Sequence, residues 1–462
     1  MITDATVVIL AGGQGTRMKS RMAKVLHRAG GKALVEHAID AARGVAPADR
    51  IFVVAGHQAD AVRAVAEAAG VGCIHQKEQL GTGHAVMCGE GQLRGLGGML
   101  IVLNGDCPMI RPETVAELVA LYQTTGSGAA MITTDLEDAT GYGRIIRAGG
   151  AVTGDVQADV QAIVEHKAAT PEQLAVHEIN AGFYCFDANM FWQHVHELGT
   201  DNPAGEYYLT DMVAILLKAG HRVTALKIAD SSELLGINNR VELAAVDKIM
   251  RDNKVRQLML GGVTIERPET VTIDGDVVIG MDSRIGPFAQ ITGRTVIGEN
   301  CTIGGSAIID NSVLGDGVEV FPFSMISASQ VDSRAHVGPF GRMRMGAHLA
   351  EGAHVGNFVE LKKTRLGAGS KAMHFAYLGD SSIGAKVNIG AGTITCNYDG
   401  KHKHQTHIGD GAFVGSNSTL VAPLEIAAGA YIAAGSVITL PVPEKSLAFG
   451  RARQVNKPGR GA

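Results

Sequence analysis

The hydrophobic positions follow two different rhythms, one before and one after about residue 260. In the first part, short runs of β-branched and aliphatic residues alternate with stretches in which apolar residues recur every three or four positions. The runs are typical of buried strands and the stretches of amphipathic helices. Their alternation predicts a mostly parallel α/β sheet. We expect strands at 6–11, 50–56, 99–106 and 128–134, and helices at 32–43, 60–70 and 112–123.

A six-residue period begins at about residue 275. An aliphatic residue followed by Gly, or by another small or acidic residue, recurs from VIGMDS at 278 to IAAGSV at 432. Hexapeptide repeats specify a β-helix, in which the aliphatic residues stack as an inner column and residues such as Gly and Asn take the corners. Known repeats of this type coil left-handed, against the usual crossover rule. Residues 395–407 break the period and predict a projecting loop.

A single long helical pattern joins the two parts. It covers residues 240–260 and ends at Gly261-Gly262, as a linker helix would. We therefore expect a Rossmann-like α/β domain at 1–239, a linker helix at 240–262, and a left-handed parallel β-helix with a C-terminal tail at 263–462.

Composition narrows the class of protein. Sixty of the 462 residues are glycine, about twice the usual share of roughly 7%. A net charge of −5 argues against a protein built to bind nucleic acid, and a hydrophobic fraction of 46% excludes a disordered chain. No apolar run approaches the ~18 residues of a membrane span, and the N-terminus has the pattern of a strand rather than a signal peptide. We expect a cytoplasmic protein with reduced cysteines, and an oligomer, because a solenoid leaves open ends and flat faces.

Candidate chemistry in the first domain begins with a glycine-rich loop, LAGGQG, directly after the first strand. Such a loop brings backbone N–H groups close to phosphates, although it is neither a Rossmann fingerprint nor a P-loop. Arg17 and Lys24 add cations that suit a triphosphate and its leaving pyrophosphate. Asp106, at the end of a strand, is a suitable ligand for Mg²⁺. Taken alone, the glycines could form only a turn, and Asp106 could only cap the next helix.

The second domain carries cations and a histidine among its repeats. Arg344, Lys362 and Lys363 suit a sugar phosphate, although each alone could belong to a solvated face. His374 and Tyr377 lie in KAMHFAYLGD, where a lone histidine could be structural. His402, His404 and His407 are poorly spaced for a metal site.

The motifs of both domains together resemble one enzyme family. LAGGQGTRM, QKEQLGTGHA, NGDCP, TGYGRI, IVEHK, EINAG and GINNR occur in order in the first part. GPFGRMRMG, VGNFVELKK, GSKAMHFAYLGD and NIGAGTITCNYDG follow in the second. This set is similar to that of the bifunctional N-acetylglucosamine-1-phosphate uridyltransferases/glucosamine-1-phosphate acetyltransferases, and the resemblance covers nearly the whole chain.

For the first domain, the resemblance implies Mg²⁺-dependent transfer of a uridylyl group from UTP to N-acetylglucosamine 1-phosphate, which gives UDP-N-acetylglucosamine and pyrophosphate. Arg17 and Lys24 would be catalytic, and Asp106 and Asn238 would bind Mg²⁺. The implied nucleotide and sugar contacts are Leu10, Ala11, Gly12, Gly13, Lys24, Gln76, Gly81, Thr82, Asn104, Gly105, Asp106, Gly143, Glu165, Asn180 and Asn238.

For the second domain, the resemblance implies acetyl transfer from acetyl-CoA to glucosamine 1-phosphate, with His374 as general base. The implied glucosamine 1-phosphate contacts are Arg344, Lys362, Tyr377 and Asn388. The implied acetyl-CoA contacts are Ala391, Asn397, Tyr398, Lys403, Ser416, Ala434 and Arg451. The resemblance further implies a homotrimer, and a product used in cell-wall and lipopolysaccharide synthesis.

Three features of the sequence depart from the family pattern. Ala23 stands where the family usually has proline, Gln14 where lysine is common, and 146–162 looks longer than the usual connection.

Two alternative functions were also considered. One alternative is a nucleotidyltransferase with a regulatory or oligomerising β-helix, as in relatives of ADP-glucose pyrophosphorylase. His374, Tyr377 and Asn388 speak against it. The other is a non-enzymatic scaffold like the translation exchange-factor subunits, which would not be expected to keep the four polar residues Arg17, Lys24, Asp106 and Asn238 together.

Overall fold

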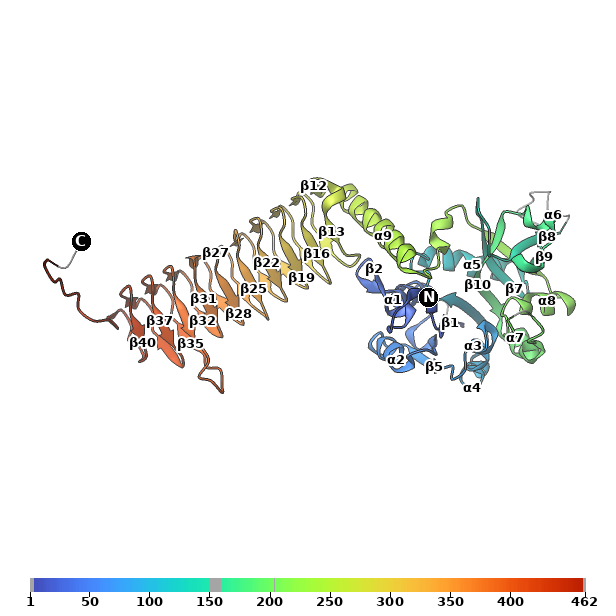
Figure 1. The fold of residues 1–462 in the computed structure, drawn as a ribbon, viewed down its shortest axis with the longest axis horizontal. Helices are drawn as coiled ribbons and strands as arrows, with labels where there is room; N and C mark the ends of the chain where they lie inside the picture. Colours follow the sequence, from blue (N-terminus) through green and yellow to red (C-terminus); the bar gives the residue numbers. More distant parts are fainter. Residues whose placement is uncertain (1–3, 149–158, 203, 460–462) are drawn as a thin grey trace. The chain divides into compact units, whose positions relative to one another are not determined.

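The computed structural model describes residues 4–148, 159–202 and 204–459 (Figure 1). The chain divides into two compact units between Lys248 and Ile249. The division falls inside helix α9 (Arg240–Leu260), whose bounds match the long helical pattern. The longer connection noted at 146–162 lies largely outside the described residues.

The first unit is built on a nine-stranded sheet with the order β11-β7-β10-β6-β1-β4-β5, and β8 and β9 lie off this path. Four neighbouring strands, β6, β1, β4 and β5, run parallel, and β10 is antiparallel to both β6 and β7. All four predicted strands are present, and the mostly parallel sheet is confirmed. The strands are β1 (Ala5–Ala11), β4 (Ile51–Ala55), β5 (Gly72–His75), β6 (Met99–Asn104), β7 (Ala129–Asp135), β8 (Arg144–Arg147), β9 (Val160–Val164), β10 (Glu178–Asp187) and β11 (Val223–Lys227).

Helices cover both faces of this sheet because its central strands are apolar on both sides. Val7 and Ile9 belong to one buried cluster and Val8 to another, so successive residues of β1 face opposite layers. The three predicted helices are present, with bounds that differ from the predicted ones by at most two residues. The helices are α1 (Leu34–Ala42), α2 (Ala59–Ala68), α3 (Thr82–Met87), α4 (Glu90–Leu93), α5 (Pro112–Thr125), α6 (Pro171–Leu174), α7 (Ala188–His194) and α8 (Asp211–Lys218).

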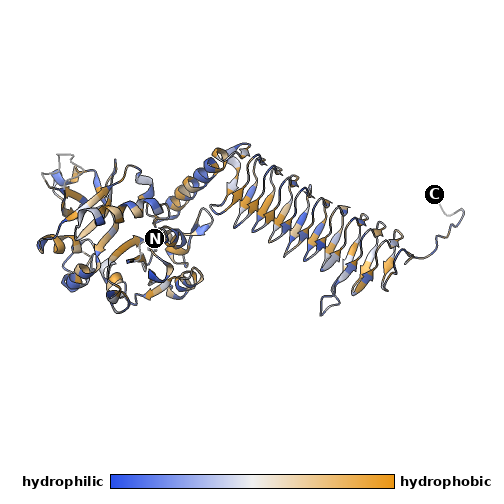
Figure 2. Cartoon of the chain, turned by 180° about the vertical axis from the view of Figure 1, so that it is seen from behind, coloured by the Kyte–Doolittle hydropathy of each residue, from blue (hydrophilic) through white to orange (hydrophobic). Residues whose placement is uncertain are grey.

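The second unit is the expected left-handed parallel β-helix. Its coils stack into three parallel sheets of eleven, ten and nine strands. Aliphatic residues such as Ile291, Ile309 and Ile326 align in register and are fully buried, which forms the inner column. The C-terminal half of α9 packs on the same core through Val255 and Leu258. Figure 2 shows hydrophobic residues gathered on the strands and hydrophilic residues on the projecting loop.

The coils that carry the candidate residues follow one plan. A strand of the eleven-stranded sheet is followed by a strand of the ten-stranded sheet and then by one of the nine-stranded sheet. The strands concerned are β25 (Arg342–Arg344), β26 (His348–Leu349), β27 (His354–Asn357), β28 (Glu360–Lys362), β29 (Arg365–Leu366), β30 (Lys371–His374), β31 (Tyr377–Gly379), β32 (Ser381–Ile383), β33 (Asn388–Ile389), β34 (Ile394–Cys396), β35 (Thr406–Ile408), β36 (Phe413–Val414) and β37 (Thr419–Val421).

Left-handed residues turn the chain at all three corners of the coil, and two of these corners carry most of the candidate residues. We call the corner between the eleven- and ten-stranded sheets the first corner, and the one between the ten- and nine-stranded sheets the second corner. Phenylalanines occupy much of the first corner, and mixed residues the second, so the sequence-based expectation of Gly and Asn is only partly correct. First-corner examples are Phe323, Phe340, Phe358, Phe375 and Asn417, and second-corner examples are Asn311, Ala328, Met345, Lys363 and Asp380. The left-handed non-glycine residues of the described chain include no β-branched residue, as steric crowding requires.

The predicted projecting loop is confirmed. It joins β34 to β35, carries the isolated bridge between Tyr398 and Lys403, and stands out from the stack in Figure 1. All six cysteines are free, and Cys107, Cys185 and Cys301 are buried. In the part of the chain that the structure describes, no helix has the length and apolar character needed to cross a membrane.

Two candidate active sites

The first candidate site is a cleft of about 530 Å³ at the carboxyl ends of the parallel strands β1 and β6. Ligands bind at this edge of open α/β sheets because loops diverge there. Ten of the residues that the motifs predicted line it: Leu10, Ala11, Gly12, Gly13, Lys24, Gln76, Gly81, Thr82, Asn104 and Asp106. Gln14, one of the departures from the family pattern, lines it too. Gln79 and Glu206 also face the cleft. Gln79 lies in the QKEQLGTGHA motif but was not predicted as a site residue, and Glu206 lies in no motif.

Four polar residues from distant parts of the chain converge in this unit. The Lys24 ammonium contacts Asp106 Oδ2 and lies 3.4 Å from Asn238 Oδ1. Arg17 donates to the same Asn238 oxygen at 2.9 Å. The segment that carries Asn238 is held against the β6 loop because the backbone N–H of Ile237 donates to the Asp106 carbonyl at 3.0 Å. The proposed catalytic and metal-binding residues of the first domain are therefore neighbours.

The same contacts test whether Asp106 and Asn238 suit Mg²⁺. Their oxygens already converge on one positive charge, the Lys24 ammonium, which stands in for a cation. A carboxylate and an amide oxygen are hard donors, and Mg²⁺ is usually held by one or two such groups together with water and substrate phosphates. The donor set fits the ion.

Gly143, Glu165 and Asn180 form a second group beside the cleft. Asn180 N–H donates to the Gly143 carbonyl at 2.9 Å, and Glu165 Oε1 lies 3.3 Å from the position of a Cβ on Gly143. Asn104, which lines the cleft, donates through its side-chain amide to the Ala181 carbonyl at 3.2 Å. Burial raises the pKa of Glu165, and the nearby Asp211 raises it further. This group suits a neutral, hydroxyl-rich ligand bound next to the glycine-rich loop.

Residues 204–210, which form neither helix nor strand, pack against the Gly81–Thr82 loop. The backbone N–H of Gly83 donates to the Tyr207 carbonyl at 2.8 Å, and that of Leu209 to the Thr82 hydroxyl at 3.0 Å. Gly81 has a positive φ of 111°, and a Cβ there would lie 2.5 Å from the Tyr207 carbonyl oxygen. Only glycine fits, which explains the LGTG motif. No periodicity marks the covering segment, so the hydrophobic pattern did not indicate it.

Ala23, the departure from the usual proline, has a local structural role. Its φ of −54° is one that proline also adopts. Its backbone N–H donates to Gln58 Oε1 at 3.0 Å, a bond that a proline could not make. Gln58 in turn donates to the Arg21 carbonyl. The loop before Lys24 is thus held by a side chain rather than by a proline ring.

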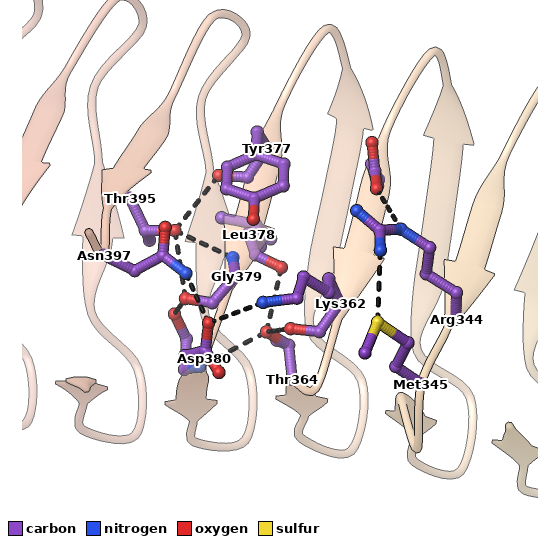
Figure 3. A network of polar contacts seen from close by, with 12 residues as sticks. Arg344, Met345, Lys362, Thr364, Tyr377, Leu378, Gly379, Asp380, Thr395 and Asn397 are labelled. Carbon is purple, nitrogen blue, oxygen red and sulfur yellow. Dashed lines mark hydrogen bonds and ion pairs between the residues drawn. The ribbon is translucent and has the colours of Figure 1, made fainter. Parts of the chain in front are cut away.

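The second candidate site lies at the second corner of the β-helix (Figure 3). Arg344 and Lys362 are register neighbours on adjacent coils, and each has an acidic partner. Arg344 Nε donates to Glu360 Oε1 at 2.6 Å, and Lys362 Nζ to Asp380 Oδ2 at 3.0 Å. The Lys362 and Asp380 side chains are 5% and 13% exposed. Glu360 and Asp380 were not singled out from the sequence, because their pairing depends on the coil register.

Tyr377 lies over Gly379 at the same place. A Cβ on Gly379 would lie 2.5 Å from the Tyr377 hydroxyl oxygen, so the missing side chain makes room for the ring. Buried hydroxyls fix the backbone beneath it: Gly379 N–H donates to Thr395 Oγ1 at 2.8 Å, and Thr364 Oγ1 donates to the Leu378 carbonyl at 2.9 Å. The side chains of Arg344, Lys362 and Tyr377 therefore stand on a rigid set of coils.

His374 belongs to the first corner, with most of the predicted acetyl-CoA residues. His374 and three of these residues occupy equivalent positions, each directly before a left-handed residue: His374, Ala391, Ser416 and Ala434 precede Phe375, Gly392, Asn417 and Gly435. Backbone bonds join this column, from Asn417 N–H to the Ala391 carbonyl at 2.7 Å and from Gly435 N–H to the Ser416 carbonyl at 2.8 Å. Arg451 Cδ lies 3.6 Å from the position of a Cβ on Gly435, and His374 is exposed.

The remaining predicted acetyl-transfer residues lie elsewhere on the coil. Asn388 is in register with Lys371 on the eleven-stranded sheet, and Asn397, Tyr398 and Lys403 lie at or beyond the second corner. Strand β31 separates His374 from the Lys362 group. One chain thus presents the predicted residues on two corners rather than in one pocket.

The histidines of the projecting loop have acidic partners instead of a metal geometry. His404 Nε2 lies 2.8 Å from Asp399 Oδ2, and His407 Nε2 lies 3.9 Å from Glu425 Oε1. Backbone N–H donation from His402, followed by the His404 contact, lowers the pKa of Asp399. Within the described ranges, no three His, Cys, Asp or Glu residues cluster as a metal site.

Comparison with known proteins matches both units. A MobA-like NTP transferase domain model matches residues 7–196, a GMPPB C-terminal domain model 273–364, and a bacterial transferase hexapeptide model 405–439. The fold and these matches define a two-part transferase, with a nucleotidyltransferase unit followed by a hexapeptide-repeat transferase unit.

Full-length relatives identify the family. The bifunctional protein GlmU of Solibacter usitatus is 57% identical over 449 residues, which are 97% of this chain and 95% of the relative. GlmU of Koribacter versatilis is 48% identical, over 98% of this chain and 96% of the relative, and GlmU of Pelobacter propionicus is 44% identical, over 99% and 98%. The chain belongs to the GlmU family of bifunctional proteins. The family resemblance deduced from the motifs is confirmed, and the two alternative functions are not supported.

Proposed function

We propose that this bifunctional transferase acetylates glucosamine 1-phosphate in its β-helix and then uridylylates the product in its α/β unit, giving UDP-N-acetylglucosamine. The observation that carries the proposal is that Lys24 and Asp106 line one cleft with the glycine-rich loop, while Asn238 lies beside Lys24 and accepts from Arg17. The match of the motifs over both units supports it.

For the uridylyl step, the cleft residues hold both phosphates and stabilise the leaving group. The glycine-rich loop offers backbone N–H groups, and Arg17 and Lys24 offer fixed positive charges. A phosphate oxygen of the sugar substrate attacks the α-phosphorus of UTP, the bond to the β-phosphate breaks, and pyrophosphate leaves. Mg²⁺ held by Asp106 and Asn238 would neutralise phosphate charge. Positioning and charge stabilisation suffice, so no protein nucleophile is required.

For the acetyl step, Arg344 and Lys362 bind the sugar phosphate, and His374 removes a proton from the sugar amine. The amine nitrogen forms a bond to the thioester carbonyl carbon, the carbon–sulfur bond breaks, and the thiol form of coenzyme A leaves. Histidine is the side chain most often used as a general base, so His374 can accept and return this proton. His374 is exposed and therefore open to substrate.

We further propose a homotrimer through the β-helix. The predicted acetyl-transfer residues lie on two corners of each coil, and an assembly in which different copies bring these corners together would complete the site. Stacked phenylalanines support this arrangement, because Phe340, Phe358 and Phe375 are 43%, 53% and 65% exposed and their rings lie 5.1–5.2 Å apart. Such an apolar stripe favours coverage by another chain. The unpaired cysteines suit a cytoplasmic location.

The test is a pair of assays on two single-site variants. Acetyl transfer is measured as release of free thiol, and uridylyl transfer as release of pyrophosphate from UTP, N-acetylglucosamine 1-phosphate and Mg²⁺. Asp106→Ala should abolish uridylyl transfer and spare acetyl transfer, and His374→Ala should do the reverse. Loss of both activities in either folded variant would contradict the two-site proposal, and acetyl transfer at a near-normal rate in His374→Ala would contradict the assignment of the base.

A further inference from the structure

Asp380 connects two groups of predicted ligand-binding residues at the second corner. Its Oδ2 atom accepts from Lys362 Nζ at 3.0 Å and also from the side-chain amide of Asn397 (Figure 3). Lys362 belongs to the sugar-phosphate group, and Asn397 to the acetyl-CoA group at the base of the projecting loop. One carboxylate oxygen therefore joins the expected positions of both substrates.

The charges around Asp380 strengthen its contact with the Lys362 ammonium. The site holds two amines and one carboxylate, because Lys403 of the projecting loop is close enough to Lys362 and Asp380 to interact with them electrostatically. The neighbouring Lys362 lowers the pKa of Lys403, and the Asp380 carboxylate opposes this effect. Burial would raise the pKa of Asp380, but donation from Lys362 and Asn397 outweighs burial and lowers it. Asp380 is the counter-ion that lets these cations lie together.

The backbone at Asp380 shows that the residue type is not set by the fold alone. Its φ is +48°, the conformation shared by all the second-corner residues named above. The equivalent positions on earlier coils are Asn311, Ala328, Met345 and Lys363, none of which is acidic. Asparagine tolerates this conformation well, so aspartate brings a charge that the turn itself does not need.

We propose that Asp380 is a positioning residue for acetyl transfer. It fixes the Lys362 ammonium for the sugar phosphate and, through Asn397, holds the projecting loop and Lys403 for acetyl-CoA. This proposal rests on the proposed acetyl-transfer function. It predicts that changes at Asp380 alter the use of both acetyl-transfer substrates, while the uridylyl reaction of the other unit stays unchanged.

Two variants separate charge from contact. Asp380→Asn keeps an oxygen that can accept from Lys362 and Asn397 but removes the charge, and Asp380→Ala removes both. We expect kcat for acetyl transfer to fall about 10-fold in D380N and about 100-fold in D380A, because a small misplacement of reacting groups has effects of this size. KM for acetyl-CoA should rise in both variants. Uridylyl transfer, measured on the same preparations, should remain at the wild-type rate.

Release of the projecting loop can be measured independently of acetyl-transfer activity. The loop contains Lys401 and Lys403, so its release can be followed as trypsin cleavage at these residues. D380A should be cut there several-fold faster than the wild type. Asp316→Ala is the matched control, because Asp316 caps the Glu299 N–H at 2.9 Å on an early coil. It should change neither loop cleavage nor acetyl transfer.

The outcomes are distinguishable. Wild-type kcat and KM values in folded D380A, with wild-type cleavage of the loop, would overturn the role of Asp380. A loss of acetyl transfer that only matches the fraction of unfolded D380A, as measured by thermal melting, would also overturn it. Absence of acetyl transfer from the wild-type enzyme would instead contradict the proposed function.

Discussion

The two units assemble their candidate sites in opposite ways. In the α/β unit, residues far apart in the chain, such as Lys24, Asp106 and Asn238, meet at one edge of a sheet within a single cleft. In the β-helix, neighbouring coils place residues in rows, so that Arg344 lies beside Lys362. The predicted acetyl-transfer residues are therefore spread over two corners. The first unit forms its site from one chain, whereas we propose that a second copy completes the site of the β-helix.

Metal removal should separate the two units most sharply. Treatment of the enzyme with excess chelator should abolish uridylyl transfer, with a loss of about 1000-fold, because phosphate charge is no longer neutralised. Acetyl transfer should be unaffected, since its proposed groups are a histidine, an arginine and a lysine. Both rates are measured before and after Mg²⁺ is restored. A loss of acetyl transfer that is restored by Mg²⁺ would contradict the proposed difference between the metal-dependent first site and the metal-independent second site.

Loss of the phosphate-binding lysine should have a large effect in the β-helix as well. Lys362→Ala removes a cation that is 5% exposed and leaves Asp380 buried without it. We expect KM for glucosamine 1-phosphate to rise by about 100-fold, a cost of about 3 kcal/mol that is typical of a charged contact. Steady-state kinetics with varied sugar phosphate test this. Lys386→Ala, which removes an exposed lysine on a later coil, is the control, and an equal effect there would indicate a general loss of surface charge.

A smaller change tests the local packing at the second corner. Gly379→Ala should displace the Tyr377 ring, because the new Cβ would lie 2.5 Å from its hydroxyl oxygen. We expect acetyl transfer to fall about 10-fold, which corresponds to about 1.4 kcal/mol. Tyr377→Phe keeps the ring and tests the hydroxyl separately. Full acetyl-transfer activity in Gly379→Ala would show that the ring position is unimportant.

The smallest effect is expected in the loop before Lys24. Ala23→Pro restores the residue that the family usually has, and the φ of −54° permits it. The rigid ring should stabilise the fold by roughly 0.4–1 kcal/mol, while loss of the bond to Gln58 costs a similar amount. Thermal melting and uridylyl transfer should both stay close to wild type. A large loss of activity would mean that the bond from Ala23 N–H to Gln58 is required for catalysis.

Periodicity predicted most of the fold, because long repeats and alternating strands give strong signals. It did not indicate β5, β8, β9, β10 or β11, or the segment that carries Tyr207. Four of these strands have only four or five residues, β10 is interrupted by Asn180 and Gly182, and the segment has no regular structure. The motifs led to Lys24, Asp106 and Lys362, which carry charge in recognisable strings. They did not lead to Glu360 or Asp380, because each pairs with a residue on the preceding coil, and this pairing is evident only once the register is known.

The central claim is that two independent sites act in sequence, and mixing two inactive variants tests it most directly. Asp106→Ala and His374→Ala are each supplied with glucosamine 1-phosphate, acetyl-CoA, UTP and Mg²⁺, alone and together, and UDP-N-acetylglucosamine is measured. Neither variant alone should form the product. The mixture should form it, because acetylated sugar phosphate made by Asp106→Ala is used by His374→Ala. A mixture of folded variants that remains inactive would contradict the account.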